Sequence, residues 1–215
     1  KIRLKNNLDK LENIKRHKGY ITPIDIRTQC MVRHQIQNQI DRGRKPLITL
    51  EECEEYWWTY SKFITQQWSY VFKEFEKIIR LPSDKAIQII DYGSGQSLAS
   101  LILLDKFFRN DKTQILDITL IDKSSLALGL ARKFLGIHSP ELGSTRLITI
   151  NEEVDNTLPE FLETNSKALK IHLFSNILDM GVIDPDQLLS KINKNRGKHL
   201  FLAVSQGSDY AKGSV

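Results

Sequence analysis

Short apolar runs alternate with helical stretches through the C-terminal part of this chain, and this alternation constrains the fold more than any other feature of the sequence. The predicted strands fall at residues 86–90, 115–121, 147–150, 170–174 and 199–204, and the predicted helices at 98–108, 125–135, 157–166 and 185–193. Each strand is apolar along its length, which indicates burial on both faces. The alternation predicts an α/β fold in which a parallel sheet is covered by helices on both faces.

The segment ahead of this alternation carries only helical patterns. We expect residues 1–82 to form an all-helical N-terminal region and residues 83–215 to form the sheet domain. Helices are predicted over residues 1–19, from Thr22-Pro23 to Gly43, and from Thr49 to Leu81.

The last of these helices has the clearest start signal. Thr49 and Glu52 fit a capping box, in which each side chain satisfies a free backbone donor of the other. Trp57 and Trp68 lie on its apolar stripe, which favours a place in the core over a base-stacking role, whereas Trp58 lies off the stripe.

The first predicted strand ends in an acid followed by two closely spaced glycines. Asp91 ends the strand, and Gly93 and Gly95 follow in the sequence Asp-Tyr-Gly-Ser-Gly-Gln. Glycine lets a turn approach a ligand closely and direct free N–H groups at it. A second acid, Asp122, ends the second strand. Because ligands of parallel sheets bind outside the carboxyl ends of the strands, these residues predict a ligand site.

This arrangement resembles motifs I and II of class I S-adenosylmethionine (SAM) dependent methyltransferases, which have a Rossmann-like fold. The resemblance covers about residues 84–205 and implies SAM as the cofactor. It implies that the glycines lie along the methionyl part, that Asp91 orients the loop and the amino group, and that Asp122 binds the ribose hydroxyls. The other residues that it places at the cofactor are Ser94, Gln96 and Lys123, with Asn151 or Glu152 near the adenine. The resemblance also implies two further strands, so we expect the core to be incomplete at its C-terminus.

A dinucleotide-binding domain is the alternative that also uses a Gly-x-Gly turn and a distal acid. Its third glycine would fall at Leu98, where a leucine obstructs the close packing of helix on strand. The strand-end Asp91 also favours SAM over NAD.

The methyl acceptor is expected at the end of the fourth strand. In the fold implied by the resemblance this end faces the methyl group, which makes Ser175, Asn176 and Asp179 candidate catalytic residues. Asn176 and Asp179 are equally well explained as helix-capping residues. His172 alternates with apolar neighbours inside the strand, which favours a hydrogen-bonded core histidine over a catalytic base.

The charge distribution suggests an anionic partner. Residues 1–50 carry a balance of +8, against −3 for the remainder of the chain. We therefore expect RNA as the acceptor, contacted by Arg42, Arg44 and Lys45. A solvated basic surface explains the charge equally well. A catalytically inactive SAM-fold scaffold and a methyltransferase acting on protein or small molecules also remain open.

The cysteine content and the hydropathy bear on location and cofactors. Cys30 and Cys53 have neither metal-site nor disulfide-framework spacing, which favours a cytoplasmic protein without a bound metal. Cys53 falls on an apolar helical stripe, where a buried thiol is expected. No apolar run approaches the roughly 20 residues that cross a bilayer, so no membrane partner is expected.

Overall fold

The computed structural model describes residues 2–29, 32–78, 86–109, 115–138, 145–155, 165, 167–181 and 183–205. Its helices are α1 (Ile2–Lys18), α2 (Pro23–Gln29), η1 (Asp41–Gly43), α3 (Leu50–Ile78), α4 (Leu98–Phe107), α5 (Ser125–His138), η4 (Leu178–Met180) and α6 (Pro185–Asn193). Its strands are β1 (Ile87–Tyr92), β2 (Ile115–Ile121), β3 (Arg146–Ile150), β4 (Leu169–Ser175) and β5 (Lys198–Val204).

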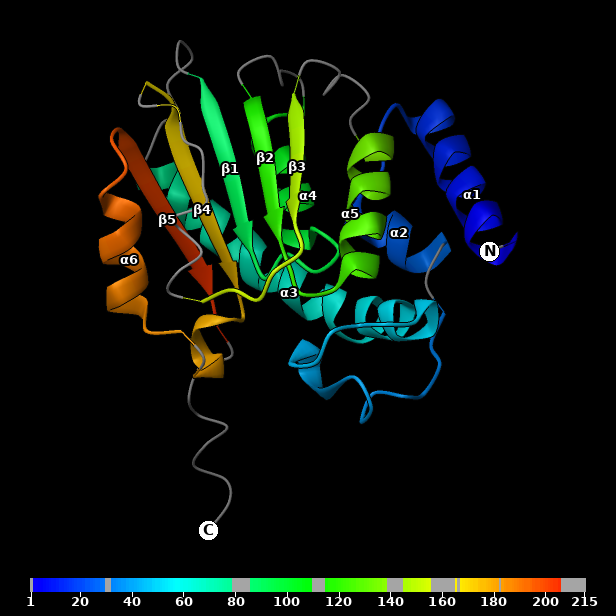
Figure 1. Cartoon of the computed structure of the whole chain (residues 1–215). Coiled ribbons are helices and arrows are strands. Elements are labelled where there is room, and N and C mark those ends of the chain that lie inside the picture. The colour runs from blue at the N-terminus through cyan, green and yellow to red at the C-terminus, as the bar shows by residue number, and fades with distance from the viewer. Residues whose placement is uncertain are drawn as a thin grey trace.

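The five strands form one sheet in the order β3-β2-β1-β4-β5, and all neighbouring strands are parallel. Helices lie on both faces, with α6 on one side of the sheet and α4 on the other (Figure 1). This confirms the predicted α/β fold class. The chain moves outward from β1 to β3 and then returns to β4, so the strand order reverses between β1 and β4. Such a reversal leaves a crevice at the carboxyl ends of the two strands.

Helix α3 joins the N-terminal helices to the sheet. It contacts α2, α4, α5 and β5, and it extends below the carboxyl ends of the strands (Figure 1). Trp57 packs edge-on against Phe134 of α5, and Trp68 stacks on Phe72. Both tryptophans are buried, which confirms their place in the core, whereas Trp58 is half-buried beneath the guanidinium of Arg27. The N-terminal helices and the sheet share one apolar core.

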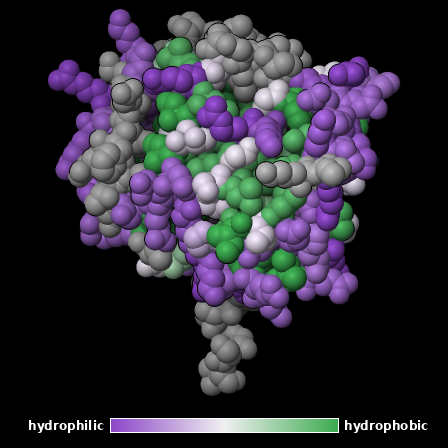
Figure 2. Space-filling view, turned by 45° about the vertical axis from the view of Figure 1, so that its right-hand side comes forward, coloured by the Kyte–Doolittle hydropathy of each residue, from purple (hydrophilic) through white to green (hydrophobic). Residues whose placement is uncertain are grey.

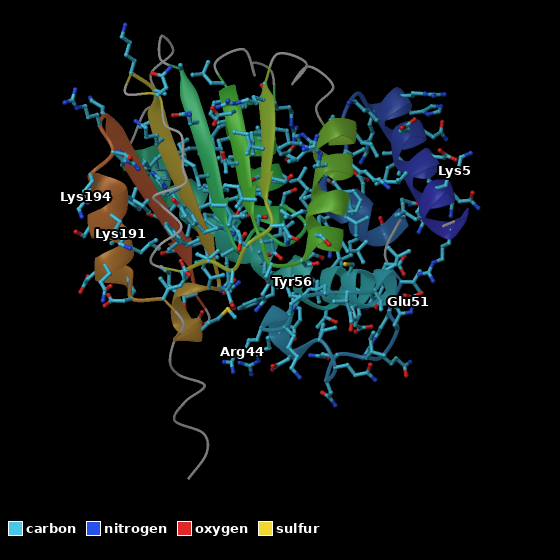
Figure 3. All side chains as sticks on the ribbon, viewed as in Figure 1. Lys5, Arg44, Glu51, Tyr56, Lys191 and Lys194 are labelled. Carbon is cyan, nitrogen blue, oxygen red and sulfur yellow. The ribbon has the colours of Figure 1, made fainter. Side chains whose placement is uncertain are left out.

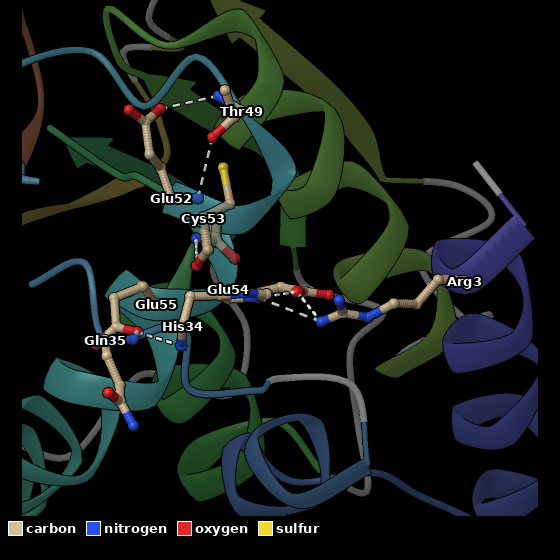
Figure 4. A network of polar contacts seen from close by, with 9 residues as sticks. Arg3, His34, Gln35, Thr49, Glu52, Cys53, Glu54 and Glu55 are labelled. Atoms are coloured by element: carbon tan, nitrogen blue, oxygen red, sulfur yellow. Dashed lines mark hydrogen bonds and ion pairs between the residues drawn. The ribbon is translucent and has the colours of Figure 1, made fainter. Parts of the chain in front are cut away.

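The start of α3 has the predicted capping box. Thr49 Oγ1 accepts a hydrogen bond from Glu52 N at 3.1 Å, and Glu52 Oε2 accepts from Thr49 N at 2.9 Å (Figure 4). One turn further along, the buried carboxylate of Glu54 pairs with Arg3 of α1 and with His34. These contacts connect three segments that are distant in the sequence.

The predicted helix from Thr22-Pro23 to Gly43 is wrong beyond Gln29. Residues 32–40 are not helical, and Gln35, Asp41 and Arg42 have positive φ values of 59°, 43° and 52°. The backbone N–H groups of His34 and Gln35 donate to the Glu55 carboxylate, which replaces the bonds that a helix would provide. The apolar spacing there reflects burial of Ile40 in the core.

Two expectations fall on residues that the structure does not describe. The predicted helix at 157–166 lies mostly outside the described residues, and so does the boundary between residues 82 and 83. The proposed division into two domains therefore stays a prediction. Cys53 is buried as expected, whereas Cys30 lies outside the described residues.

On the face shown in Figure 2, polar side chains surround apolar side chains that gather across its middle. No helix within the described ranges is both long and apolar enough to cross a membrane.

Candidate functional site

The pocket that several of the predicted site residues line lies at the carboxyl ends of β1, β2 and β4, where the strand order reverses. It is lined by the glycine turn, by the ends of these strands and by a segment from the N-terminal region. The lining residues that the sequence had indicated are Arg42, Lys45, Gly93, Gly95, Asp122, Lys123, Ser175 and Asn176. Those that it had not indicated are Gly43, Leu47, Tyr56, Glu153, Val154, Ile177, Met180 and Ile183.

The turn after β1 needs both of its glycines. Gly93 and Gly95 have positive φ values of 60° and 51°, a region that favours glycine. A Cβ atom on Gly93 would lie 2.5 Å from Ile177 Cγ2, so any side chain there would collide with the pocket wall. A Cβ atom on Gly95 would meet no heavy atom within 4 Å. The backbone of Gly95 is therefore open toward the pocket.

The Asp122 carboxylate is held at the edge of this turn. Its Oδ2 atom accepts a hydrogen bond from Gly95 N at 2.8 Å, and its Oδ1 atom accepts from Ser124 N at 2.7 Å. Burial raises the pKa of Asp122, and the two backbone donors counteract part of that effect. Each carboxylate oxygen has a second acceptor site, so both can still receive a hydroxyl group from a ligand.

Asp91 occupies a different position from the one expected. It is fully buried beneath the turn, it does not line the pocket, and its Oδ2 atom accepts from Ser100 Oγ at 2.7 Å. Burial raises its pKa to about 7. Its Oδ1 atom has no hydrogen-bond partner within the part of the chain that the structure describes. The structure thus places Asp91 as a support of the turn, without direct access to the pocket.

Residues 42–47, here called the strap, contribute to the lining of the pocket and are tied to the residues after Asp122. Lys123 Nζ donates to the Arg44 carbonyl oxygen, and Ser124 Oγ donates to the Leu47 carbonyl oxygen at 2.5 Å. Gly43 allows the strap to approach α3, because a Cβ atom there would lie 2.9 Å from Tyr56 Cε2. Figure 3 shows Arg44 at the outer edge of the molecule below Tyr56.

The end of β3 contributes different residues from those expected. Asn151 Nδ2 donates to the Asp122 carbonyl oxygen at 3.0 Å, which supports the loop, but neither Asn151 nor Glu152 lines the pocket. Glu153 and Val154 line it instead, and Glu153 lies 3.6 Å from Lys123 Nζ. Glu152, Glu153 and Asp155 lie close together in the sequence, and no pattern there indicates which of these acids faces the pocket.

The end of β4 brings two of the three candidate catalytic residues to the pocket. Ser175 and Asn176 line it, whereas Asp179 lies exposed on η4, outside it. Ser175 Oγ accepts from Trp68 Nε1 at 3.2 Å, and Asn176 has a left-handed φ of 56°. The Asn176 Oδ1 atom is buried without a hydrogen-bond partner in the described part of the chain.

His172 is a core residue, as expected. Its Nδ1 atom lies 3.1 Å from the Tyr92 hydroxyl group and its Nε2 atom lies 3.0 Å from His199 Nδ1. Burial lowers the pKa of His172 to about 3, so the imidazole stays neutral.

Ile177, Met180 and Ile183 form an apolar wall that the sequence analysis missed. They become neighbours of the glycine turn only because the chain folds back through η4 after β4, and no distinctive spacing marks this return. Among the described residues, no three His, Cys, Asp or Glu side chains lie close enough together to hold a metal ion.

No protein-family model and no curated protein matches the sequence. Solved structures of SAM-dependent methyltransferases are similar to it. A plantazolicin methyltransferase in complex with SAH is 14% identical over 71% of this chain and 51% of that chain, with a TM-score of 0.43. An rRNA methylase from Streptococcus thermophilus is 13% identical over 72% of this chain and 81% of that chain, with a TM-score of 0.37. A SAM-dependent methyltransferase from Agrobacterium tumefaciens is 13% identical over 70% of this chain and 47% of that chain, with a TM-score of 0.40. The present chain thus spans about half the length of the first and third of these proteins.

Proposed function

We propose that this protein is a SAM-dependent methyltransferase whose acceptor is RNA. The observation that carries the proposal is the placement of the Asp122 carboxylate beside the open backbone of Gly95, in a pocket where the strand order reverses. Two acceptor oxygens on one carboxylate suit the two adjacent hydroxyl groups of a ribose. The donors and acceptors around the glycine turn therefore fit a nucleoside cofactor.

The residues of the pocket have distinct roles in this proposal. Asp122 binds the ribose, and its position is held by the backbone N–H groups of Gly95 and Ser124. Asn151 steadies the same loop through the Asp122 carbonyl oxygen. Val154, which follows β3, and Leu47 of the strap provide apolar contact in the pocket.

Bound SAM supplies a methyl group on a positively charged sulfur atom, so the protein needs chiefly to align the acceptor with it. Ser175 and Asn176 are placed to do so at the end of β4. Ser175 Oγ is oriented by the indole N–H of Trp68, and the buried Asn176 Oδ1 atom offers an acceptor to an N–H or O–H group of the substrate.

The strap supports RNA as the acceptor. Arg42 and Lys45 line the pocket, and Arg44, between them in the sequence, lies at the outer edge of the molecule (Figure 3). All three side chains are at least partly accessible and none of them belongs to the core. Cations at the entrance of a pocket attract phosphate groups and position a nucleic acid without reading its sequence.

A salt titration of RNA binding tests this proposal. Replacing Arg42, Arg44 and Lys45 with glutamine should lower the affinity and flatten the dependence of log K on log salt by about 2, since each phosphate contact on single strands contributes about 0.7. The matched control replaces Lys194, Arg196 and Lys198, which are exposed near the start of β5, with the same loss of charge.

The two triple variants are compared with the wild type by filter binding at several salt concentrations, and transfer of a labelled methyl group from SAM to RNA is measured in parallel. Equal slopes for both variants would contradict RNA contact by the strap. Label that enters protein or small molecules would reassign the acceptor, and binding of SAM without any transfer would indicate a scaffold.

A further inference from the structure

A groove lies between α1 and α5, at the side of the molecule away from α6 (Figure 1). The two helices contact each other, and the groove has a volume of about 460 Å³. It is lined by four cations, Lys15 and Arg16 from α1 and Arg132 and Lys133 from α5, and by a single described acid, Glu12. It shares no described lining residue with the pocket at the glycine turn. Two segments that are distant in the sequence thus form a separate basic groove.

Two of these cations are not engaged inside the protein. Arg16 and Lys133 are exposed, and neither makes a hydrogen bond or an ion pair within the part of the chain that the structure describes. The other two are oriented by backbone acceptors: Arg132 Nη1 donates to a carbonyl oxygen of β3 at 3.2 Å, and Lys15 Nζ donates to a carbonyl oxygen of α5. The groove therefore presents positive charge to a ligand from both helices.

Apolar surface accompanies these cations. Leu8 and Ile137 line the groove together with Gly136. A Cβ atom on Gly136 would meet no heavy atom of the described chain within 4 Å, although glycine inside a helix is less stable than alanine. Packing in the described chain does not require glycine here, and the groove is open to the α5 backbone. Cations beside apolar surface suit a single nucleic-acid strand, which presents both phosphates and the flat faces of its bases.

Helix α5 connects this groove to the pocket at the glycine turn. Lys123 lines that pocket, and α5 begins two residues later at Ser125. From Ser125 to Lys133 the helix rises roughly 12 Å, at about 1.5 Å per residue. One strand of a nucleic acid covers that distance with about four nucleotides, at about 3.4 Å each. A single phosphate group cannot contact both places, whereas a short nucleic acid can.

We propose that the groove between α1 and α5 is a docking surface for the RNA strand beyond the acceptor nucleotide, an assignment that rests on the proposed function. The strand follows α5 from the pocket to the groove. Arg16 and Lys133 contact its phosphates, and the strand lies against the α5 backbone at Gly136. Helix α1 then binds RNA together with α5, in addition to the contacts that the strap provides.

A double variant, Arg16→Gln with Lys133→Gln, tests the phosphate contacts. For a single-stranded RNA of about 12 nucleotides, the affinity should fall about fivefold per lost contact at about 0.1 M salt, and the dependence of log K on log salt should flatten by about 1.4. Both side chains are exposed, so the fold should be retained. The matched control is Lys194→Gln with Arg196→Gln, which removes the same charge at exposed positions on the other side of the molecule (Figure 3) and should change both quantities much less.

The length of the RNA separates the groove from the pocket. Extending the RNA from about 3 to about 12 nucleotides should tighten its binding to the wild type, because only the longer strand contacts both places. The double variant should lose most of this gain and should bind the shorter RNA like the wild type. A double variant that keeps the whole gain would contradict the proposed path along α5.

Gly136→Ala tests whether the strand enters the groove or is only attracted by its charge. The added methyl group meets no described atom of the protein, so the urea midpoint should not fall, whereas the affinity for the longer RNA should. Gly129→Ala is the matched control, because Gly129 is also an exposed glycine of α5 with open space at its Cβ position, but it does not line the groove. Equal RNA affinities of the two alanine variants would contradict occupation of the groove.

The outcomes distinguish this inference from the function on which it rests. If the strap variants weaken RNA binding and the groove variants do not, the inference is wrong and the proposed function stands. If the wild type does not bind RNA, the proposed RNA acceptor fails. If the double variant loses binding of a polyglutamate peptide while its RNA affinity is unchanged, the groove serves an acidic protein segment and the inference is wrong.

Discussion

The buried position of the Asp91 carboxyl group beneath the glycine turn can be tested quantitatively, because burial makes the stability of the protein depend on pH. Burial raises its pKa to about 7, against roughly 3.9 in an unfolded chain. Between these two pH values the folded state holds a proton that the unfolded state releases. The free energy of unfolding therefore falls as pH rises through this window, by ~1.4 kcal/mol per pH unit, and levels off above the folded pKa.

Asp91→Asn removes the titrating group and keeps an oxygen that can accept from Ser100 Oγ. Relative to the wild type, this variant should gain roughly 2–3 kcal/mol of stability between pH 5 and pH 8. Urea unfolding of both proteins across this range measures the difference. His172, whose pKa is lowered by burial, is present in both proteins, so its contribution cancels in the difference. Parallel stability curves would refute the reasoning, because they would show that the Asp91 pKa is not raised by burial.

Two further predictions concern the helix cap and the ribose site. Thr49→Ala removes the oxygen that accepts from Glu52 N and should lower the free energy of unfolding by about 1 kcal/mol. Urea unfolding should show this loss as a lower midpoint with an unchanged slope. Thr28→Ala, on an exposed face of α2, is the control and should change the free energy of unfolding little. Asp122→Ala should weaken S-adenosylhomocysteine binding by about 1.5–3 kcal/mol with the fold retained, as measured by calorimetry and circular dichroism; an unchanged dissociation constant would place the ribose site on another strand.

The sheet could be predicted from the sequence because each strand is a short apolar run between turn signals. All five predicted strands agree with the structure within two residues at either end. The glycine turn and Asp122 could be predicted as site residues because they directly follow these strands, whose carboxyl ends meet at one edge of a parallel sheet.

The rest of the pocket depends on long-range packing, which local patterns do not encode. The strap reaches the pocket because Ile40 and Leu47 are buried in the core and because Lys123 and Ser124 bind its carbonyl groups. In the sequence, Ile40 continues an apolar spacing that is typical of a helix, and this led to the wrong prediction for residues 32–40. The inward position of Asp91 likewise depends on Ser100, which only the folded turn brings to it.

Calorimetry of the wild-type protein with S-adenosylhomocysteine and, separately, with NAD tests the central claim most directly. The geometry of Asp122, Gly93 and Gly95, together with Leu98 at the position of the third dinucleotide-binding glycine, favours the first ligand. We predict saturable binding of S-adenosylhomocysteine and no binding of NAD under the same conditions. Tight binding of NAD without a response to S-adenosylhomocysteine would contradict the account.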